Sequence, residues 1–180
     1  TAFVAADLLS QAEHDELASQ FGYHQHGTGQ EGIRRGGRLL KVLSRSDIIK
    51  KTLDNYGYIL VAESMEKAVE TANSIAPEYM EIVTRNPFEV MTKIQNAGAI
   101  FIGEYSSEPL GDYFAGPNHI LPTNGTAKFS RPWAWMIYQK SSIIYYSREA
   151  LEAAHKNIET FAESEHLTAH ANSVRVRFEQ

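Results

Sequence analysis

The sequence predicts an α/β fold in which helices cover a parallel sheet. Three short, mostly apolar runs, at residues 58–61, 80–83 and 99–102, are strand candidates by length and by β-branched or aromatic content, and the first is typical of a buried strand. The segments between them carry apolar residues at helical spacing. The order strand, helix, strand, helix, strand requires a crossover connection after each strand, and such connections join parallel strands.

A helix is predicted over residues 46–55, directly before the first strand, because apolar residues recur there at helical spacing and Gly57 follows as a stop signal. These apolar residues are Ile48, Ile49 and Leu53. After the strand at 58–61, Ser64 is suited to cap a second helix, which Pro77 interrupts. The apolar side of that helix consists of Met65, Val69, Ala72 and Ile75.

The second and third strands flank a short helix. It is predicted over residues 88–95, with Pro87 at its N-terminal position, where a missing N–H group costs nothing. Ligands of parallel sheets collect beyond the carboxyl ends of the strands. We therefore expect Glu78 and Asp112 at that edge of the sheet.

Both ends of the chain are predicted to be helical, with an extended tail. An amphipathic segment around Leu8 and Leu9 opens the chain, and a last helix is predicted over residues 148–162. Residues 174–178, Val-Arg-Val-Arg-Phe, alternate apolar and basic side chains as an edge strand does. We expect residues 131–180 to form an arm of helix and extended chain. The apolar face of the last helix should contain Leu151, Ala154, Ile158 and Phe161.

Composition excludes several classes of protein. The 180 residues are 43% hydrophobic and 22% charged, which is ordinary for a globular chain. A net charge of -5 with scattered Lys and Arg provides no basic stripe for nucleic acid. We also find neither an apolar run of membrane-spanning length nor a signal sequence, and expect a cytoplasmic protein with no membrane partner. Because cysteine is absent, a transition metal would need His, carboxylate or amide ligands.

Residues 111–123, Gly-Asp-Tyr-Phe-Ala-Gly-Pro-Asn-His-Ile-Leu-Pro-Thr, place Asp112 and His119 seven positions apart. Two glycines and two prolines disfavour regular structure there, and loops held on a rigid scaffold often present binding and catalytic groups. An ordinary tight connection would explain a lone Asp and His. Two other segments, however, add similar chemistry.

Those two segments lie near the ends of the chain. Residues 6–14, Ala-Asp-Leu-Leu-Ser-Gln-Ala-Glu-His, place Gln11 and His14 on one face of a helix. Residues 165–172, Glu-His-Leu-Thr-Ala-His-Ala-Asn, add a carboxylate and two imidazoles. Together the three segments resemble histidinol dehydrogenase, the zinc- and NAD-dependent enzyme family that completes histidine biosynthesis.

The resemblance implies a zinc site and an NAD-linked oxidation. Family members convert L-histidinol to L-histidine through the aldehyde, with two hydride transfers to NAD, while zinc fixes the alcohol carbon against the nicotinamide. By the same resemblance His119 and Glu165 bind the substrate, and so do the metal ligands. The family pattern assigns four metal ligands: Gln11, His14, Asp112 and His170.

The resemblance also suggests catalytic roles for two neighbouring residues. Glu78 matches a carboxylate that helps water add to the aldehyde. The family has a basic His directly after it, whereas this chain has Tyr79. A phenol with an ordinary pKa near ~10 is a poor base at neutral pH unless its surroundings depress that pKa. Simple packing explains Tyr79 equally well.

For the architecture, the resemblance implies the C-terminal half of a partial Rossmann-like domain over residues 1–130 and a dimerisation arm over 131–180. In the family this arm reaches across a two-fold homodimer, so His170 is expected in the neighbouring subunit's site.

Two segments, residues 20–37 and 131–139, interrupt the resemblance, and we expect both to be out-of-frame translations. Trp and Met each have a single codon, so residues 131–137 read one base out of phase are compatible with a Ser-Pro-Leu-Gly-Val-x-Asp-like run of the family. Residues 20–37 contain six glycines and no periodicity where the family has a buried strand and a helix. We therefore predict a weakened fold over residues 20–37.

The chain opens at Thr1 rather than Met, and we expect a fragment whose nucleotide-binding half lies before that residue. No convincing dinucleotide fingerprint is present, so the contacts with NAD stay unassigned. Two alternatives to the enzyme remain open. One is a catalytically inactive metal-binding or dimerisation fragment of the same family. The other is a zinc hydrolase, which would act without NAD.

Overall fold

The computed structural model describes residues 2–24, 29–117, 121–123, 125–128 and 141–179. The chain forms two compact units. The first contains Thr1–Glu63 together with Glu152–Gln180, and the second contains Ser64–Leu151. The chain returns from the second unit to the first between Leu151 and Glu152, inside helix α7 (Arg148–Ser164). Among the helices of the described residues, none combines the length and the apolar character needed to cross a membrane.

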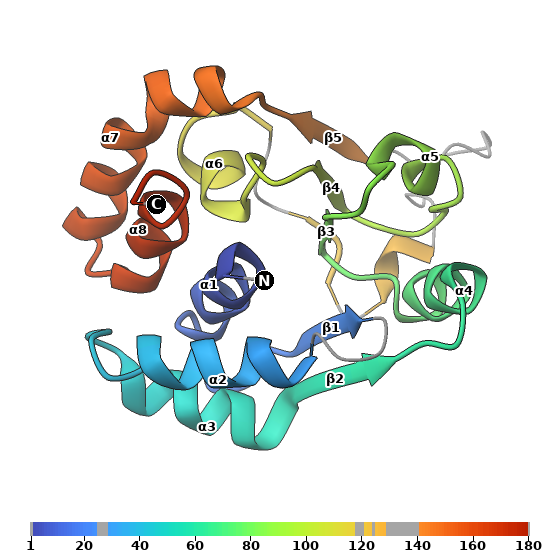
Figure 1. Cartoon of the computed structure of the whole chain (residues 1–180), viewed down its shortest axis with the longest axis horizontal. Coiled ribbons are helices and arrows are strands. Elements are labelled where there is room, and N and C mark those ends of the chain that lie inside the picture. Colours follow the sequence, from blue (N-terminus) through green and yellow to red (C-terminus); the bar gives the residue numbers. More distant parts are fainter. Residues whose placement is uncertain (1, 25–28, 118–120, 124, 129–140, 180) are drawn as a thin grey trace. The chain divides into compact units, whose positions relative to one another are not determined.

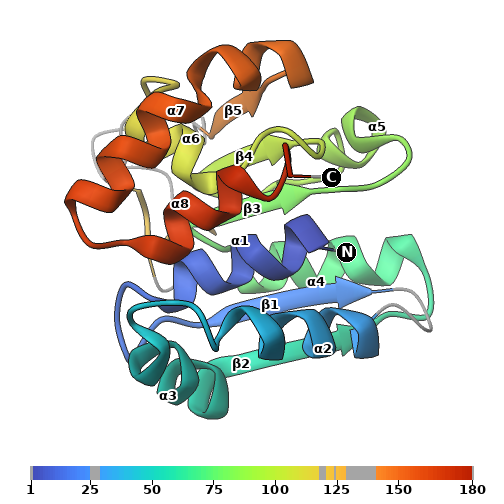
Figure 2. The same cartoon turned by 60° about the vertical axis from the view of Figure 1, so that its left-hand side comes forward.

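The first unit has a two-stranded parallel sheet, β1 with β2, covered by helices (Figure 2). Phe21 of β1 lies opposite Tyr58 of β2, and their rings stack with centroids 5.1 Å apart. Besides the last part of α7, its elements are α1 (Ala2–Ala12), β1 (Gln20–His24), α2 (Gly29–Leu39), α3 (Ser46–Tyr56), β2 (Gly57–Val61) and α8 (Thr168–Arg175).

The core of the first unit joins the two ends of the chain. Buried apolar residues from α1, from α3 and the segment before it, and from α8 pack together, with partly buried leucines around them. Since helices bury one apolar stripe, this shared core fixes which faces of α1 and α8 meet. Its buried members are Leu9, Ala12, Leu43, Ile49 and Ala169.

A buried ion pair reinforces the packing of α8 on α1. Arg177, only 1% exposed, donates two hydrogen bonds to Asp7, at 2.8 Å to Oδ1 and 2.7 Å to Oδ2. Ser173 donates a further bond to Asp7 Oδ1 at 2.6 Å, and the Arg177 guanidinium lies 5.1 Å from the centre of the Phe3 ring. A two-pronged arginine–carboxylate bond sets distance and orientation together, so it fixes the register of the two helices.

The second unit has a three-stranded parallel sheet in the order β3-β4-β5 (Figure 1). The central strand β4 is buried along its whole length, as expected of a strand with a neighbour on each side. Apart from the start of α7, its elements are α4 (Met65–Ile75), β3 (Tyr79–Ile82), α5 (Pro87–Met91), β4 (Ala99–Ile102), α6 (Glu108–Tyr113), a 3-10 turn (Thr126–Lys128) and β5 (Ser142–Tyr145).

The predicted parallel α/β character is confirmed, although the strands form two small sheets rather than one. The predicted strand at 58–61 exists as part of β2, but the expectation that it is buried is wrong: Tyr58, Ile59 and Val61 are between 40% and 57% exposed. Its apolar sequence could not reveal this, because burial depends on how many elements cover a strand, and among the described residues β2 has only β1 as a strand neighbour.

The described part of residues 20–37 forms β1 and α2. A weakened fold over residues 20–37 stays a prediction. A parallel ladder uses backbone groups, so β1 needs no particular apolar pattern to pair with β2. In α2 the charged Arg34 and Arg35 are exposed. A Cβ added at Gly36 or Gly37 would have no other atom within 4 Å, so these glycines do not mark places where the chain is tightly packed. The other interruption, residues 131–139, lies outside the described residues.

The predicted edge strand at 174–178 is also wrong, because α8 continues to Arg175 and a turn follows it. Val174 and Arg177 are both buried, three positions apart as on one face of a helix. An alternating strand would instead have placed Arg177 outside with Arg175. The preceding helix, predicted at 148–162, is present as α7, with Phe161 exposed and Ala162 buried in its place.

Residues 152–180 therefore belong to the same compact unit as the start of the chain, and α8 packs on α1 (Figure 2). The units divide the chain at Ser64 and after Leu151. The division into a domain at residues 1–130 and an arm at residues 131–180 stays a prediction. The role of this arm in a dimer stays a prediction.

Candidate metal centre

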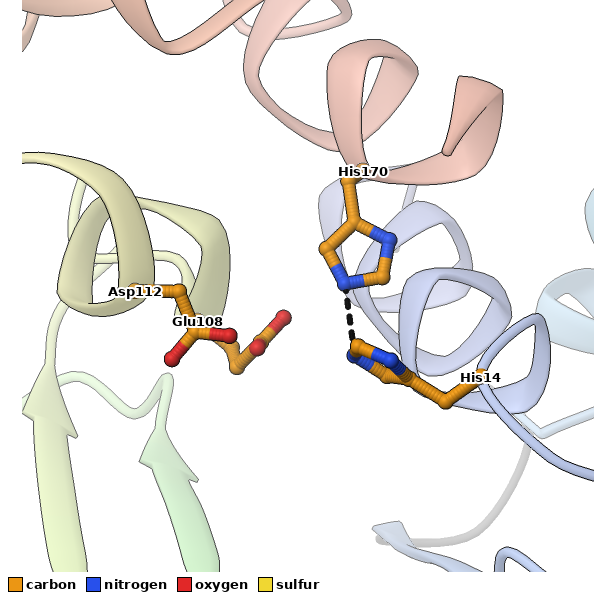
Figure 3. Close-up of side chains that lie close together, drawn as sticks. All are labelled: His14, Glu108, Asp112 and His170. Atoms are coloured by element: carbon orange, nitrogen blue, oxygen red, sulfur yellow. Dashed lines mark hydrogen bonds between the residues drawn. The ribbon is translucent and has the colours of Figure 1, made fainter. Parts of the chain in front are cut away.

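Two imidazoles from opposite ends of the chain face each other in the first unit (Figure 3). The Nε2 atoms of His14 and His170 lie 2.8 Å apart, and the rings are nearly perpendicular at 86° with centroids 4.4 Å apart. His170 comes from α8 and is fully buried, whereas His14 follows the end of α1 and is exposed. The pair therefore lies where one ring is fixed inside the protein and the other reaches the surface.

Local structure accounts for the position of each ring. Helix α1 ends in a turn in which the Glu13 N–H donates to Leu9 O at 3.2 Å and the His14 N–H to Gln11 O at 3.4 Å. Glu13 is thereby turned inward and His14 outward. At the other end, His166 has a φ of 60°, in the left-handed region that often ends a helix, and this turn separates α7 from α8.

Glu13 is a buried carboxylate that the sequence pattern does not single out. Its Oε1 accepts a hydrogen bond from the ring Nδ1 of His170 at 2.6 Å and from the backbone N–H of His170 at 2.8 Å. Its Oε2 accepts from the backbone N–H of Ala169 at 3.0 Å. Helix α8 has Leu167 at its N-cap, which cannot supply a side-chain acceptor, so Glu13 satisfies its first N–H groups from outside.

Gln11 is in α1, which ends at Ala12, so His14 lies in the turn that follows and not on the same helix face as predicted. The side-chain Nε2 of Gln11 is buried without a hydrogen-bond partner among the described residues. Buried amide groups are normally paired, so one without a partner calls for an explanation. A half-turn flip of the Gln11 side-chain amide exchanges its oxygen and nitrogen. After the flip, Oε1 would occupy the buried position of Nε2 and could accept a bond there. A bound cation would satisfy it there.

The donors of the first unit fit a zinc ion. Zinc accepts neutral imidazole nitrogens at about 2.0–2.1 Å, so two of them on a tetrahedral ion lie about 3.3–3.4 Å apart, and the 2.8 Å between His14 Nε2 and His170 Nε2 would have to widen by about 0.5 Å for both to bind one ion. The carboxylate of Glu13 behind His170 provides the outer-shell acceptor that usually accompanies a metal-binding histidine.

Asp112, the predicted carboxylate ligand, lies in the second unit on α6, as does Glu108 (Figure 3). Two contacts position this helix. The N–H of Glu108 donates to Glu81 Oε1 of β3 at 3.1 Å. Gly111 leaves room for Phe101 of β4, since a Cβ at Gly111 would lie only 2.7 Å from the Phe101 ring.

Tyr79 contacts Asp112 directly. Its phenol donates a hydrogen bond to Asp112 Oδ1 at 3.3 Å beside a hollow of about 10 Å³, roughly the room that one water needs. Tyr79 is the first residue of β3 and Glu78 precedes it. The expectation that Glu78 lies beyond the carboxyl ends of the strands is therefore wrong, because it stands at the amino end of β3.

The surroundings of Glu78 and Tyr79 raise both pKa values. Burial raises the pKa of the Glu78 carboxyl, and the negative charge of Asp112 raises it further. Burial is also the main cause of the raised pKa of the Tyr79 phenol, to which the carboxylates of Asp112, Glu108 and Glu78 add. A base needs a lowered phenol pKa, so these shifts disfavour Tyr79 as a base and leave it as a hydrogen-bond donor.

The two predicted substrate contacts have different outcomes. His119 lies outside the described residues. Glu165 is exposed, on the turn between α7 and α8 that leads to His170.

Comparison with known proteins identifies the family of this chain. The histidinol dehydrogenase family profile matches residues 1–178. The histidinol dehydrogenase of Caldanaerobacter subterraneus subsp. tengcongensis is 49% identical and that of Clostridium acetobutylicum 50% identical, each over 98% of this chain and 41% of the relative. The crystal structure of histidinol dehydrogenase from Elizabethkingia anophelis superimposes with a TM-score of 0.69 at 32% identity, over 99% of this chain and 41% of that one. The chain thus spans about two fifths of the length of the curated relatives it matches.

Proposed function

Because the chain belongs to the histidinol dehydrogenase family, we propose that it is the C-terminal portion of an enzyme that oxidises L-histidinol to L-histidine with NAD and zinc. The observation that carries the proposal is the pair of Nε2 atoms of His14 and His170, 2.8 Å apart. We assign the contacts with NAD to the part of the relatives that this chain does not match, since the sequence contains no dinucleotide fingerprint.

We propose four zinc ligands, one amide oxygen, two imidazole nitrogens and one carboxylate oxygen. The amide without a partner and the Glu13-bound imidazole support this set. When bound, zinc supplies orientation, because it anchors the amino alcohol with its carbinol carbon toward the nicotinamide. The ligands are Gln11, His14, Asp112 and His170.

Glu78 is proposed to act in the second half of the reaction. There a water molecule adds to the aldehyde and must lose a proton, and a carboxylate with a raised pKa accepts that proton more readily than an ordinary one. The carboxyl is half-buried beside Tyr79 and Asp112 in the second unit.

Tyr79 is proposed to have a different role, in which its O–H holds the Asp112 carboxylate in one rotamer. The raised pKa of the phenol supports this role, because it keeps the donating hydrogen in place. Substrate contacts are proposed for His119 and Glu165.

A second candidate function is a metal-binding fragment without catalysis. Two observations favour it: Tyr79 has a raised pKa where the family has a basic His, and the chain spans only about two fifths of its relatives. Such a fragment would keep the zinc ligands and lack an efficient base for the alcohol proton.

One experiment distinguishes these functions. The purified chain is assayed for bound zinc by mass spectrometry and for NADH formation with L-histidinol and NAD. Zinc with NADH supports the enzyme, and zinc without NADH supports the fragment. Absence of zinc after reconstitution contradicts both.

We also propose a homodimer in which the C-terminal arms are exchanged, so that the His14–His170 contact of one chain is rebuilt between two chains. Exchange preserves every contact of α8 and therefore costs little. The test mixes a His14→Ala variant with a His170→Ala variant after partial unfolding. Restored zinc binding supports exchange, since each mixed dimer then has one intact site, whereas no restoration or a monomer in sedimentation contradicts it.

A further inference from the structure

Glu13 stands out among the buried charged residues because it contacts a proposed metal ligand without being one itself. Both it and His170 are 0% exposed, and Oε1 lies 2.6 Å from the ring Nδ1 of His170. The two residues are 157 positions apart in sequence. A carboxylate in this place is costly to bury unless hydrogen bonds satisfy it, and three N–H groups do so here.

The arrangement determines which nitrogen of His170 carries the hydrogen. An ionised carboxylate only accepts hydrogen bonds, so Nδ1 of His170 must donate to Glu13. In the neutral ring the other nitrogen, Nε2, then carries a lone pair. In the ion-free chain that lone pair accepts a hydrogen bond from Nε2–H of His14 at 2.8 Å, and it is the lone pair with which His170 would bind the proposed ion once His14 Nε2 gives up its hydrogen.

Glu13 also fixes the ring in space. Its two oxygens accept hydrogen bonds from the backbone N–H groups of Ala169 and His170, so the carboxylate is tied to the same helix turn that carries the imidazole. The backbone and the side chain of His170 are thus held by one group. With three donors on two oxygens, the carboxylate has little freedom to rotate.

We propose that Glu13 is a positioning residue that sets the Nδ1–H tautomer and the orientation of His170 and so prepares it as a metal ligand. The proposal deepens the function proposed above and rests on its zinc site. Outer-shell partners of this kind typically alter metal affinity by 10- to 100-fold when they are removed. Glu13 itself touches neither the substrate nor the ion in this account.

The test compares Glu13→Gln with the matched control Glu16→Gln, which makes the same chemical change at an exposed residue of the same unit, paired with Lys51 at 2.8 Å. Nitrogen NMR of the zinc-free chain at about pH 8, where imidazoles are largely neutral, reports the tautomer of His170. Zinc titration reports affinity. Circular dichroism checks that each variant folds.

We expect the Nδ1–H tautomer in the parent chain, its loss or mixing in Glu13→Gln, and a roughly 10- to 100-fold weaker zinc affinity in that variant only. An Nε2–H tautomer in the parent chain overturns the proposal even if Glu13→Gln does not fold. Unchanged tautomer and affinity in a folded Glu13→Gln overturn it as well. If the parent binds no zinc but shows the tautomer change, the zinc function fails while the positioning role of Glu13 stands.

Discussion

The phenol of Tyr79 donates a hydrogen bond to Asp112, joining the first residue of β3 to the short helix α6. In this bond the phenol is the donor. Burial and the neighbouring carboxylates also raise the pKa of the phenol, so it keeps the hydrogen that it donates. We therefore expect Tyr79 to support a neighbouring carboxylate rather than to abstract a proton.

Replacing Tyr79 by Phe tests this role. We expect the free energy of unfolding to fall by about 1 kcal/mol, the ordinary worth of one hydrogen bond, and zinc binding to weaken. When both proteins are titrated from neutral pH to about pH 11, the absorbance of ionised tyrosine should rise equally in the parent and in the variant, because the Tyr79 phenol of the parent stays protonated over this range. An extra phenol that ionises near neutral pH in the parent would show that Tyr79 is suited to act as a base.

The carboxyl of Glu78 should make stability depend on pH. Its folded-state pKa is raised above the value of 4.5 expected without the fold, so the folded chain binds this proton more tightly than the unfolded chain does. Stability therefore falls as the pH rises from that value through the folded-state pKa. Glu78→Gln removes the effect.

Urea unfolding of the parent and Glu78→Gln at acid and neutral pH measures the effect. Relative to the parent, the variant should gain stability on going from acid to neutral pH. A stability difference that is the same at both pH values would mean that the fold does not alter this carboxyl.

The buried pair of Arg177 and Asp7 should be one of the most sensitive positions of the first unit. Arg177→Ala leaves the Asp7 carboxylate buried without its charge partner, and such losses cost about 3–5 kcal/mol. Since α8 carries His170, zinc affinity should decrease as well. Urea unfolding and zinc titration measure both effects, with Lys67→Ala as the control, since its pair with Glu70 is solvent-exposed. Equal stability of the two variants would refute the structural role of the pair.

Gly111 should not tolerate a larger side chain. In Gly111→Ala the added Cβ would lie 2.7 Å from the ring of Phe101, and overpacking of this kind costs about 1–3 kcal/mol. The matched control is Gly36→Ala in α2, where nothing lies within 4 Å of the added atom. That change should stabilise the helix by about 0.5–1 kcal/mol. Thermal unfolding that shifts both variants in the same direction would contradict the packing described for α6.

Local sequence patterns predict the elements whose side chains interact mainly with near neighbours. The apolar runs at 80–83 and 99–102 match β3 and β4. The strand β5 was not predicted, although Ile143-Ile144-Tyr145 offers an apolar β-branched run that could have indicated it.

Features that depend on distant segments could not be predicted. Glu13 precedes His14 and resembles an ordinary helix-end residue, since its partner His170 lies 157 positions away. The alternating pattern at 174–178 predicts an edge strand, and only the distant partner Asp7 explains why Arg177 is buried. The exposure of β2 likewise depends on which elements cover it.

The zinc content of histidine variants tests the central claim most directly, namely that His14 and His170 hold one divalent ion. The parent, His14→Ala, His170→Ala and the control His155→Ala are reconstituted with zinc, dialysed and analysed by mass spectrometry. His155 contacts Phe178 and Glu152 and has no part in the proposed site. We predict about one zinc per chain in the parent and the control and a loss of zinc in both of the other variants. Zinc retained in full by both His14→Ala and His170→Ala would contradict the claim.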